Sequence, residues 1–203
     1  MSESRELKQP IVLIGGGGHC KACIDVIETT GKWDILGILD LPERMGEMVL
    51  GYPIVGTDDQ VGRFVAEGAR FLVCVGQIRT ADARRGAYER VKEAGGKLAT
   101  IVSPLAYVSP SAVIGEGTIV MHRAIVNASA SVGDNVIINT MALVEHDATV
   151  GSHCHVSTAT VLNGGVGIGV GSFVGSNAVV IQGAAVPENS FVPAGTLYRQ
   201  REE

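Results

Sequence analysis

Aromatic residues are scarce in this 203-residue sequence: they make up 4% of it, although 46% of the chain is apolar. An excess of one charge is also missing, because 16 Lys and Arg stand against 21 Asp and Glu and leave a net charge of −5. Such a chain does not favour nucleic acid or an anionic membrane as a partner. No apolar run approaches the length of a bilayer span, and residues 1–9 form a polar leader without the apolar core of a signal peptide. These absences predict a soluble cytoplasmic protein.

Cysteine is rare as well. The four cysteines do not form the disulfide framework of a secreted domain, so reduced thiols are expected. Cys20 and Cys23 form a C-x-x-C pair at a predicted helix start, where a thiol pKa falls and redox chemistry becomes possible. The alternative, which we favour, is that both are simply small residues of this segment.

What the sequence does contain is a six-residue repeat from Val108 to Val192. Every sixth residue is aliphatic, the residue two places earlier is usually small or β-branched, and the next residue is often Gly. A period of six fits neither a helix nor an ordinary strand. It predicts a parallel β-helix, in which short strands meet at sharp corners and successive coils stack. The aliphatic positions are Val108, Ile114, Val120, Val126, Val132, Ile138, Val144, Val150, Val156, Leu162, Ile168, Val174, Val180, Val186 and Val192.

The first half of the chain has a different pattern. An apolar run at 11–14 leads into the Gly-rich stretch 15–18, and a helix is expected from Lys21 to about Gly31. A strand, a Gly-rich turn and a helix can cradle a phosphate, because the helix N-terminus offers free N–H groups and the positive end of its dipole. Asp40 follows a second strand, about where dinucleotide folds hold a ribose. The full G-x-G-x-x-G pattern is absent, and a Gly-rich turn without a ligand is the alternative.

Strands and helices continue to alternate up to Ser103 and Pro104. We expect a helix at 61–67, a strand at 71–75, a helix at 81–94 and a strand at 98–102. Alternation predicts a small Rossmann-like α/β domain with a parallel sheet, here residues 1–104, followed by an all-β domain at 105–203. Ligands of such a sheet bind at the carboxyl ends of its strands, near Gly17, Gly18, His19, Asp40 and Gly76.

His146 is the residue most suited to chemistry. It lies two places after the core residue Val144, so it belongs to a corner outside the coil, between Glu145 and Asp147. A neighbouring carboxylate fixes the tautomer of an imidazole and keeps it basic near neutral pH. A solvated polar corner is the alternative.

The tripeptide His153, Cys154 and His155 suggests a zinc site. Cys154 occupies an interior position of the repeat, so the flanking histidines diverge, whereas zinc needs four converging ligands. We favour His155 as a polar contact on a cofactor-binding surface.

Four stretches together resemble one family: the Ile14–His19 loop, the Gly51–Gly56 turn, the 144–147 corner and the hexad repeat. They are similar to bacterial sugar acetyltransferases of the sialic acid O-acetyltransferase-like group, and within it to nucleotide-linked amino-sugar N-acetyltransferases. The resemblance implies a left-handed β-helix, homotrimers and acetyl-CoA sites between subunits. It implies no metal, since a thioester is already activated.

The resemblance also implies roles for single residues. It makes His146 the general base and Asp147 the acid that raises its basicity. It places acetyl-CoA against His155, Gly164 and Ser176, and the nucleotide-sugar, UDP- or GDP-linked, against Gly17, Gly18, His19 and Asp40. Two alternatives stay open: O-acetylation of a sugar hydroxyl, as in sialic acid, and a non-catalytic trimeric binding protein. The nucleobase and the sugar are not determined by the sequence.

Overall fold

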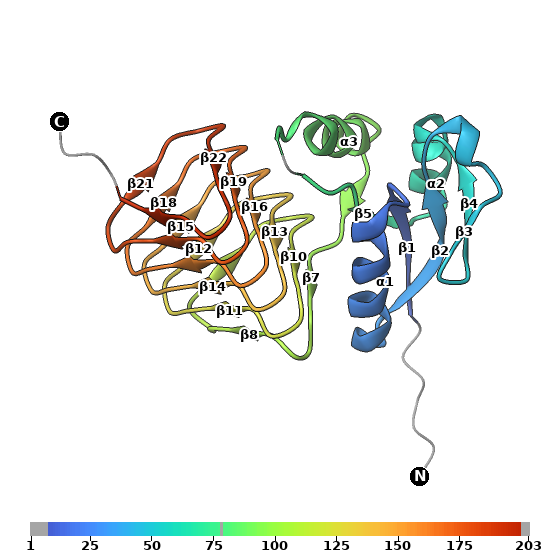
Figure 1. The fold of residues 1–203 in the computed structure, drawn as a ribbon. Coiled ribbons are helices and arrows are strands. Elements are labelled where there is room, and N and C mark those ends of the chain that lie inside the picture. The colour runs from blue at the N-terminus through green and yellow to red at the C-terminus, as the bar shows by residue number, and fades with distance from the viewer. Residues whose placement is uncertain (1–7, 78, 200–203) are drawn as a thin grey trace, which may run out of the picture.

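The computed structural model of the chain describes residues 8–77 and 79–199; residues 1–7, which hold most of the predicted polar leader, and residues 78 and 200–203 lie outside the described part. An α/β unit and a coil of short strands lie side by side, and helix α1 (Gly18–Thr30) lies between their sheets (Figure 1). Among the described residues no helix is long and apolar enough to cross a membrane.

The α/β unit is a doubly wound sheet with strand order β3-β4-β2-β1-β5-β6, in which neighbours are parallel except β3 and β4. The chain first builds one side of β1 and then returns to the other side at β5. The carboxyl ends of β1 and β5 therefore flank the switch point where such folds bind ligands. The elements are β1 (Gln9–Ile14), α1, β2 (Trp33–Leu39), η1 (Pro42–Arg44), β3 (Met48–Val49), β4 (Tyr52–Gly56), η2 (Asp58–Gln60), α2 (Val61–Ala66), β5 (Arg70–Val73), α3 (Asp82–Glu93) and β6 (Lys97–Leu98).

The second part is a left-handed parallel β-helix whose two-residue strands form three faces. Face 1 contains β7 (Ile101–Val102), β10 (Ile119–Val120), β13 (Ile137–Ile138), β16 (His155–Val156), β19 (Phe173–Val174) and β22 (Phe191–Val192). Face 2 contains β8 (Tyr107–Val108), β11 (Ile125–Val126), β14 (Leu143–Val144), β17 (Val161–Leu162), β20 (Val179–Val180) and β23 (Leu197–Tyr198). Face 3 contains β9 (Val113–Ile114), β12 (Ser131–Val132), β15 (Thr149–Val150), β18 (Gly167–Ile168) and β21 (Ala185–Val186).

Two residues of each hexad fill the coil interior. From Val120 to Val192 the aliphatic position is buried, and so are the residues two places earlier up to Ala184, such as Ala124 and Cys154. Small side chains let three walls approach one another closely, which is why the coil needs few aromatic rings. The hexad prediction is confirmed.

The corners turn through residues with left-handed backbone conformation. Asp147 has φ 59° and Asn135 has φ 53°, values that short polar residues tolerate better than branched ones. Corners are named here by the faces that they join. The 2–3 corner contains residues 145–147 and 163–165, and the 1–2 corner contains residues 139–140, 157–158 and 175–176.

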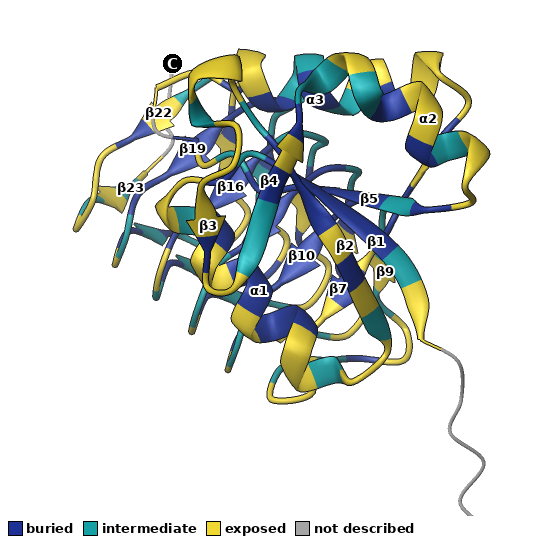
Figure 2. Ribbon diagram, turned by 90° about the vertical axis from the view of Figure 1, so that its right-hand side faces the viewer, coloured by how far each residue is buried: buried dark blue, intermediate teal, exposed yellow. Residues whose placement is uncertain are grey.

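The α/β unit packs directly on face 1. Ile24 and Ile27 of α1 share one buried cluster with Ile119 and Ile137, the outward-pointing residues of face 1 (Figures 1 and 2). Apolar side chains on the outside of a coil need a cover, and α1 supplies it. Face 1 is therefore the side of the β-helix that adjoins the α/β unit.

Several element boundaries differ from the sequence expectation. Strand β1 begins at Gln9 within the predicted leader, α1 begins at Gly18 rather than Lys21, and the strand expected at 98–102 is two strands. Lys97–Leu98 pairs with β5, whereas Ile101–Val102 already pairs with β10 of the β-helix. Two apolar pairs so close together read as one run, because periodicity does not reveal the partner of a strand. The division into residues 1–104 and 105–203 stays a proposal.

Candidate active site

His146 lies on the 2–3 corner with its ring in solvent, as the hexad phase predicts. Its side chain is 58% exposed, and its Nδ1 lies 2.8 Å from Oδ2 of Asp147. The backbone N–H of His146 donates to Oε2 of Glu145, which also accepts a hydrogen bond from Asn127. Neighbouring groups thus hold both the ring and the backbone of His146.

The Asp147 contact determines which nitrogen of His146 is basic. Because a carboxylate only accepts hydrogen bonds, Nδ1 carries the proton and Nε2 keeps a free lone pair in the neutral ring. The hydrogen bond to Asp147 raises the pKa of His146 above 6.5, and the charge of Glu145 raises it further. His146 therefore has the tautomer and the basicity of a general base.

Gly164 stacks on His146 from the next coil. A Cβ built on Gly164 would lie 2.6 Å from Cε1 and 2.7 Å from Nε2 of the imidazole. A side chain here would push the exposed ring aside, so a glycine at 164 keeps the imidazole where it lies. The N–H of Gly164 makes no hydrogen bond with any described residue.

His155 lies in a different place, buried between face 1 and the loop after β5. Its Nδ1 lies 2.9 Å from the carbonyl oxygen of Gln77, and its Nε2 lies 3.0 Å from Nδ2 of Asn139. The carbonyl must accept, so Nδ1 donates and Nε2 accepts, which defines a neutral ring. Burial lowers the pKa of His155 to about 4. In the single chain His155 connects the two parts of the protein, and its contact with acetyl-CoA stays a prediction.

Ser176 lies on the 1–2 corner, where its hydroxyl is 2.9 Å from that of Ser157. Gly17 and Gly18 have open space around them, since a Cβ on either would meet nothing within 4 Å. His19 points toward the β-helix, with its ring centroid 6.3 Å from that of His155. Gly76 adjoins His19, because a Cβ on Gly76 would lie 3.7 Å from the Cβ of His19.

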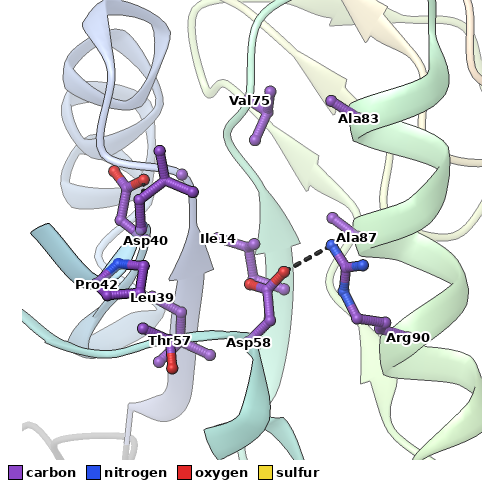
Figure 3. Close-up of a pocket in the computed structure, with 12 residues that line it drawn as sticks. Ile14, Leu39, Asp40, Pro42, Thr57, Asp58, Val75, Ala83, Ala87 and Arg90 are labelled. Atoms are coloured by element: carbon purple, nitrogen blue, oxygen red, sulfur yellow. Dashed lines mark hydrogen bonds and ion pairs between the residues drawn. The ribbon is translucent and has the colours of Figure 1, made fainter. Parts of the chain in front are cut away.

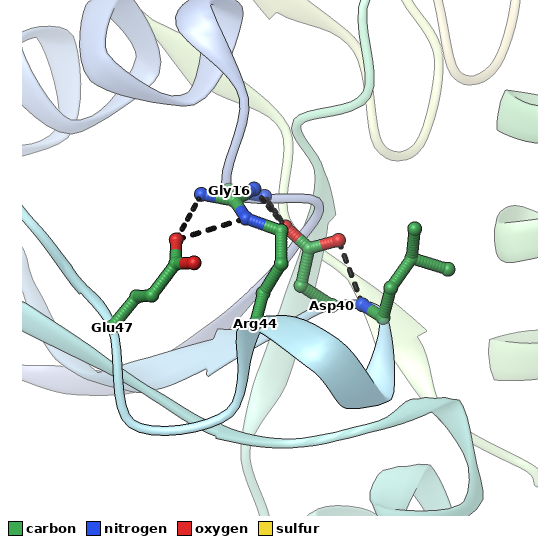
Figure 4. Close-up of polar contacts among 5 residues, drawn as sticks. Gly16, Asp40, Arg44 and Glu47 are labelled. Atoms are coloured by element: carbon green, nitrogen blue, oxygen red, sulfur yellow. Dashed lines mark hydrogen bonds and ion pairs between the residues drawn. The ribbon is translucent and has the colours of Figure 1, made fainter.

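Asp40 holds the Gly-rich loop in place. Its Oδ2 accepts from the N–H of Gly16 at 2.7 Å and from Arg44 at 2.5 Å, and its Oδ1 accepts from the N–H of Leu41 at 2.8 Å (Figure 4). Arg44 also forms an ion pair with Glu47. Both Asp40 oxygens are thus engaged within the chain, and its contact with a ribose stays a prediction.

A cavity of about 470 Å³ opens at the carboxyl ends of β1, β2 and β5, beside α3 (Figure 3). It lies at the switch point of the sheet and within the size range of small-molecule sites. Sequence reasoning missed most of its lining, which comes from segments far apart in the chain: Ile14, Gly15, Leu39, Asp40, Leu41, Pro42, Thr57, Asp58, Val75, Ala83, Ala87 and Arg90.

One chain does not bring all the predicted residues together. His146, Asp147 and Gly164 lie on the 2–3 corner, whereas His155 and the Gly-rich loop lie at face 1. Face 2 separates the 2–3 corner from the 1–2 corner and its Ser176.

The thiols are all buried. Cys20 and Cys23 lie on the buried side of α1 against Cys74, and Cys154 lies inside the coil. The hydrogen bond with Cys74 lowers the pKa of Cys23, and burial raises that of Cys74. No three His, Cys, Asp or Glu side chains of the described residues converge as metal ligands.

A His–Asp pair on a corner of a left-handed β-helix, joined to a small doubly wound domain, defines a hexapeptide-type acyltransferase. Comparison with known proteins agrees. The family model described as the PglD N-terminal domain matches residues 10–91. The acetyltransferase domain of PglB from Neisseria gonorrhoeae FA1090, solved with acetyl coenzyme A, is 32% identical, with a TM-score of 0.87 over 95% of this chain and 91% of that one.

A second solved relative is PerB from Caulobacter crescentus, in complex with CoA and GDP-perosamine. It is 35% identical, with a TM-score of 0.86 over 94% of this chain and 89% of that one. The chain belongs to this family of hexapeptide-repeat sugar acetyltransferases. A curated relative, the uncharacterized protein L142 of Acanthamoeba polyphaga mimivirus, is 33% identical over 109 residues, and the match spans 20% of its length.

Proposed function

We propose that this protein is an acetyl-CoA-dependent N-acetyltransferase that acts on a nucleotide-linked amino sugar. The observation that carries the proposal is the His146–Asp147 pair, which leaves Nε2 of His146 free and basic, with Gly164 next to the ring. The similarity to a PglB domain that holds acetyl-CoA and to a PerB enzyme that holds CoA and GDP-perosamine supports both substrates.

The chemistry needs only these groups. The amine of the sugar attacks the thioester carbonyl, Nε2 of His146 removes the proton of the amine, and Asp147 stabilises the imidazolium. The N–H of Gly164 donates to the oxygen that becomes negative in the tetrahedral intermediate. Collapse of the intermediate breaks the C–S bond and gives the acetamide and the thiolate of CoA, which takes up the proton from His146 and becomes the thiol.

The donor and the acceptor are assigned to different parts of the chain. We propose that acetyl-CoA lies along Gly164, Ser176 and His155, and that the diphosphate of the sugar nucleotide lies against Gly17 and Gly18. The open space over these glycines and the N-terminus of α1 support the diphosphate position, because free N–H groups there favour an anion. These substrates, together with four buried free thiols, support the cytoplasm as its compartment.

We propose a homotrimer whose active sites are shared between subunits. In a cyclic assembly with face 2 toward the symmetry axis, the 2–3 corner of one subunit meets the 1–2 corner of the next. That contact would join His146 of one subunit to Ser176 and the adjoining α/β unit of its neighbour. The separation of these groups within one chain supports this arrangement.

The surface of face 2 supports the same assembly. All its outward positions are large and apolar, whereas those of face 3 include Ser131, Thr149 and Gly167. An uncovered apolar row of this kind marks an interaction surface. The face 2 row is Tyr107, Ile125, Leu143, Val161, Val179 and Leu197, of which Tyr107, Ile125 and Leu197 are exposed by 40% or more.

The catalytic assignment is tested by His146→Ala. General base catalysis contributes roughly 10²–10⁴-fold, so kcat should fall by about that range. The fold should persist because the side chain of His146 is 58% exposed, and acetyl-CoA should still bind. Steady-state kinetics and calorimetric titration measure both. Wild-type turnover in His146→Ala would show that another group is the base, and an acetyl ester cleaved by mild base would show transfer to a hydroxyl instead.

Subunit complementation tests the shared site. Gly17→Asp should block the diphosphate without disturbing the fold, because Gly17 is the helix N-cap, where Asp is favoured, and its Cβ has room. Neither this variant nor His146→Ala should be active alone. Mixed trimers refolded from equal amounts should recover roughly a quarter of the sites, since each site takes one group from each subunit. No recovery in mixed trimers would place the site within one chain.

A further inference from the structure

Four polar side chains line the cavity in the α/β unit: Asp40, Thr57, Asp58 and Arg90. Asp40 already accepts three hydrogen bonds, from Gly16, Leu41 and Arg44, and the hydroxyl of Thr57 donates to Asp59. Asp58 and Arg90 are bound to each other. Oδ2 of Asp58 lies 2.6 Å from Nη2 of Arg90, and the other oxygen of Asp58 binds no described residue.

These two side chains come from opposite sides of the cavity. Asp58 lies in η2 after strand β4, Arg90 lies on α3, and their ion pair spans the cavity in front of Ile14 (Figure 3). Aliphatic walls come from Ile14, Val75 and Ala87. A flat, polar-edged ring with apolar faces matches such a lining.

Charge decides how a sugar nucleotide enters. The Asp58–Arg90 ion pair carries no net charge, whereas the N–H groups at Gly17 and Gly18, at the N-terminus of α1, attract a diphosphate. Gly15 lines the cavity, so the Gly-rich loop and the cavity adjoin. With the diphosphate at the loop, the nucleobase is the part that reaches Asp58 and Arg90.

We propose that Asp58 and Arg90 select guanine, so that the sugar donor is GDP-linked; this rests on the proposed function. Guanine presents two adjacent donors, N1–H and N2–H, and beside them the acceptor O6. The two oxygens of Asp58 accept both donors and Arg90 donates to O6, which makes every contact charge-assisted.

Other bases match this pair less well. Uracil has one donor, N3–H, between two carbonyl oxygens, so one carbonyl faces a carboxylate oxygen. Cytosine and adenine each offer an amino group beside an acceptor nitrogen. In these three cases the carboxylate is left facing an acceptor, and such repulsion is an effective source of specificity.

Calorimetric titration of the full chain with GDP, UDP, CDP and ADP tests the proposal. A bidentate contact discriminates by roughly tenfold to hundredfold, so GDP should bind more tightly than the other three by about that factor. Equal affinities, or tighter binding of UDP, would overturn the proposal and leave a nucleotide-sugar enzyme in place. If acetyl-CoA binds and none of the four nucleotides does, the proposed function names the wrong acceptor.

Variants identify the residues. Asp58→Asn turns one acceptor into a donor, so the affinity for GDP should fall to within about threefold of the affinity for UDP. The matched control is Glu67→Gln, which removes the exposed Arg63–Glu67 ion pair and leaves the cavity lining intact. Exposed pairs contribute little to stability, so both variants should fold, and thermal unfolding verifies this. An unchanged GDP preference in Asp58→Asn would overturn the proposal.

Arg90→Ala should reduce the ratio of the GDP affinity to the UDP affinity. An equal loss of affinity for all four nucleotides would mean that Arg90 binds phosphate instead of O6.

Discussion

The buried imidazole of His155 makes the stability of this protein depend on pH in a defined way. In the fold the ring is neutral, donates to the carbonyl of Gln77 and accepts from Asn139. Protonation would place a second N–H opposite the amide of Asn139 and a charge in the junction between the two parts of the chain. Burial accordingly lowers the pKa of His155 to about 4, from about 6.5 in the unfolded chain.

The sign of the effect follows from the proton count. Between pH 6.5 and 4 the unfolded chain binds a proton at His155 and the folded chain does not, so folding becomes less favourable as pH falls. The stability contributed by the neutral ring is fully present above pH 6.5. At about 1.4 kcal/mol per pKa unit, roughly 2 kcal/mol is lost between pH 7.5 and 5, and about 3 kcal/mol by pH 4.

Chemical denaturation at pH 7.5 and pH 5, at one fixed protein concentration, measures this loss. His155→Gln keeps one donor and one acceptor but does not titrate, so its stability should fall less over this interval, by about 2 kcal/mol. His146→Ala is the matched control, because it removes an exposed histidine and should retain the wild-type loss at His155. An equal pH dependence in wild type and His155→Gln would refute the neutral buried ring.

Three further predictions concern the catalytic corner and the assembly. Gly164→Ala should lower kcat by roughly a hundredfold, because its Cβ displaces the ring of His146. Gly167→Ala, whose Cβ has ordinary contacts, is the control. Normal kinetics in Gly164→Ala would contradict the need for a glycine. Asp147→Asn should lower the pKa of His146, so the acid limb of the pH–rate profile should move to lower pH while the plateau falls; an unmoved limb would separate Asp147 from the base. Val161→Asp on face 2 should dissociate the trimer in sedimentation, whereas Thr149→Asp on face 3 should not, and a trimeric Val161→Asp would place the interface elsewhere.

The β-helix could be predicted from sequence because its rules are local. Each hexad places one aliphatic residue inside and one turn at a corner, so the phase of the repeat alone put His146 outside the coil beside Asp147. The same phase placed Cys154 inside. Local rules also gave the type of the α/β elements, although their boundaries shifted where a strand changed partners, as at Leu98 and Ile101.

Contacts between distant segments could not be predicted in this way. The spacing of the motif predicted that Asp40 contacts a ribose, but it did not predict that the fold brings Gly16 and Arg44 to the Asp40 carboxylate. His155 falls on the outward side of face 1, and whether that side meets solvent or the α/β unit is decided by how α1 docks. Asp58 and Arg90 carry no motif at all, because only the packing of α3 over the sheet makes them partners.

The predicted site residues lie on two different corners of the coil, and the shape of the coil explains why. A coil only three short strands around cannot enclose two substrates, so its catalytic groups must lie on the outside and be completed by another surface. The chain's own α/β unit packs on face 1, and the outward residues of face 3 are mostly small, so we propose that face 2, which is apolar and uncovered, supplies the contact. We therefore propose that the row of outward apolar residues on face 2 and His146 at its edge act together: the row would bind a second subunit, and His146 would act on the substrate which that subunit holds.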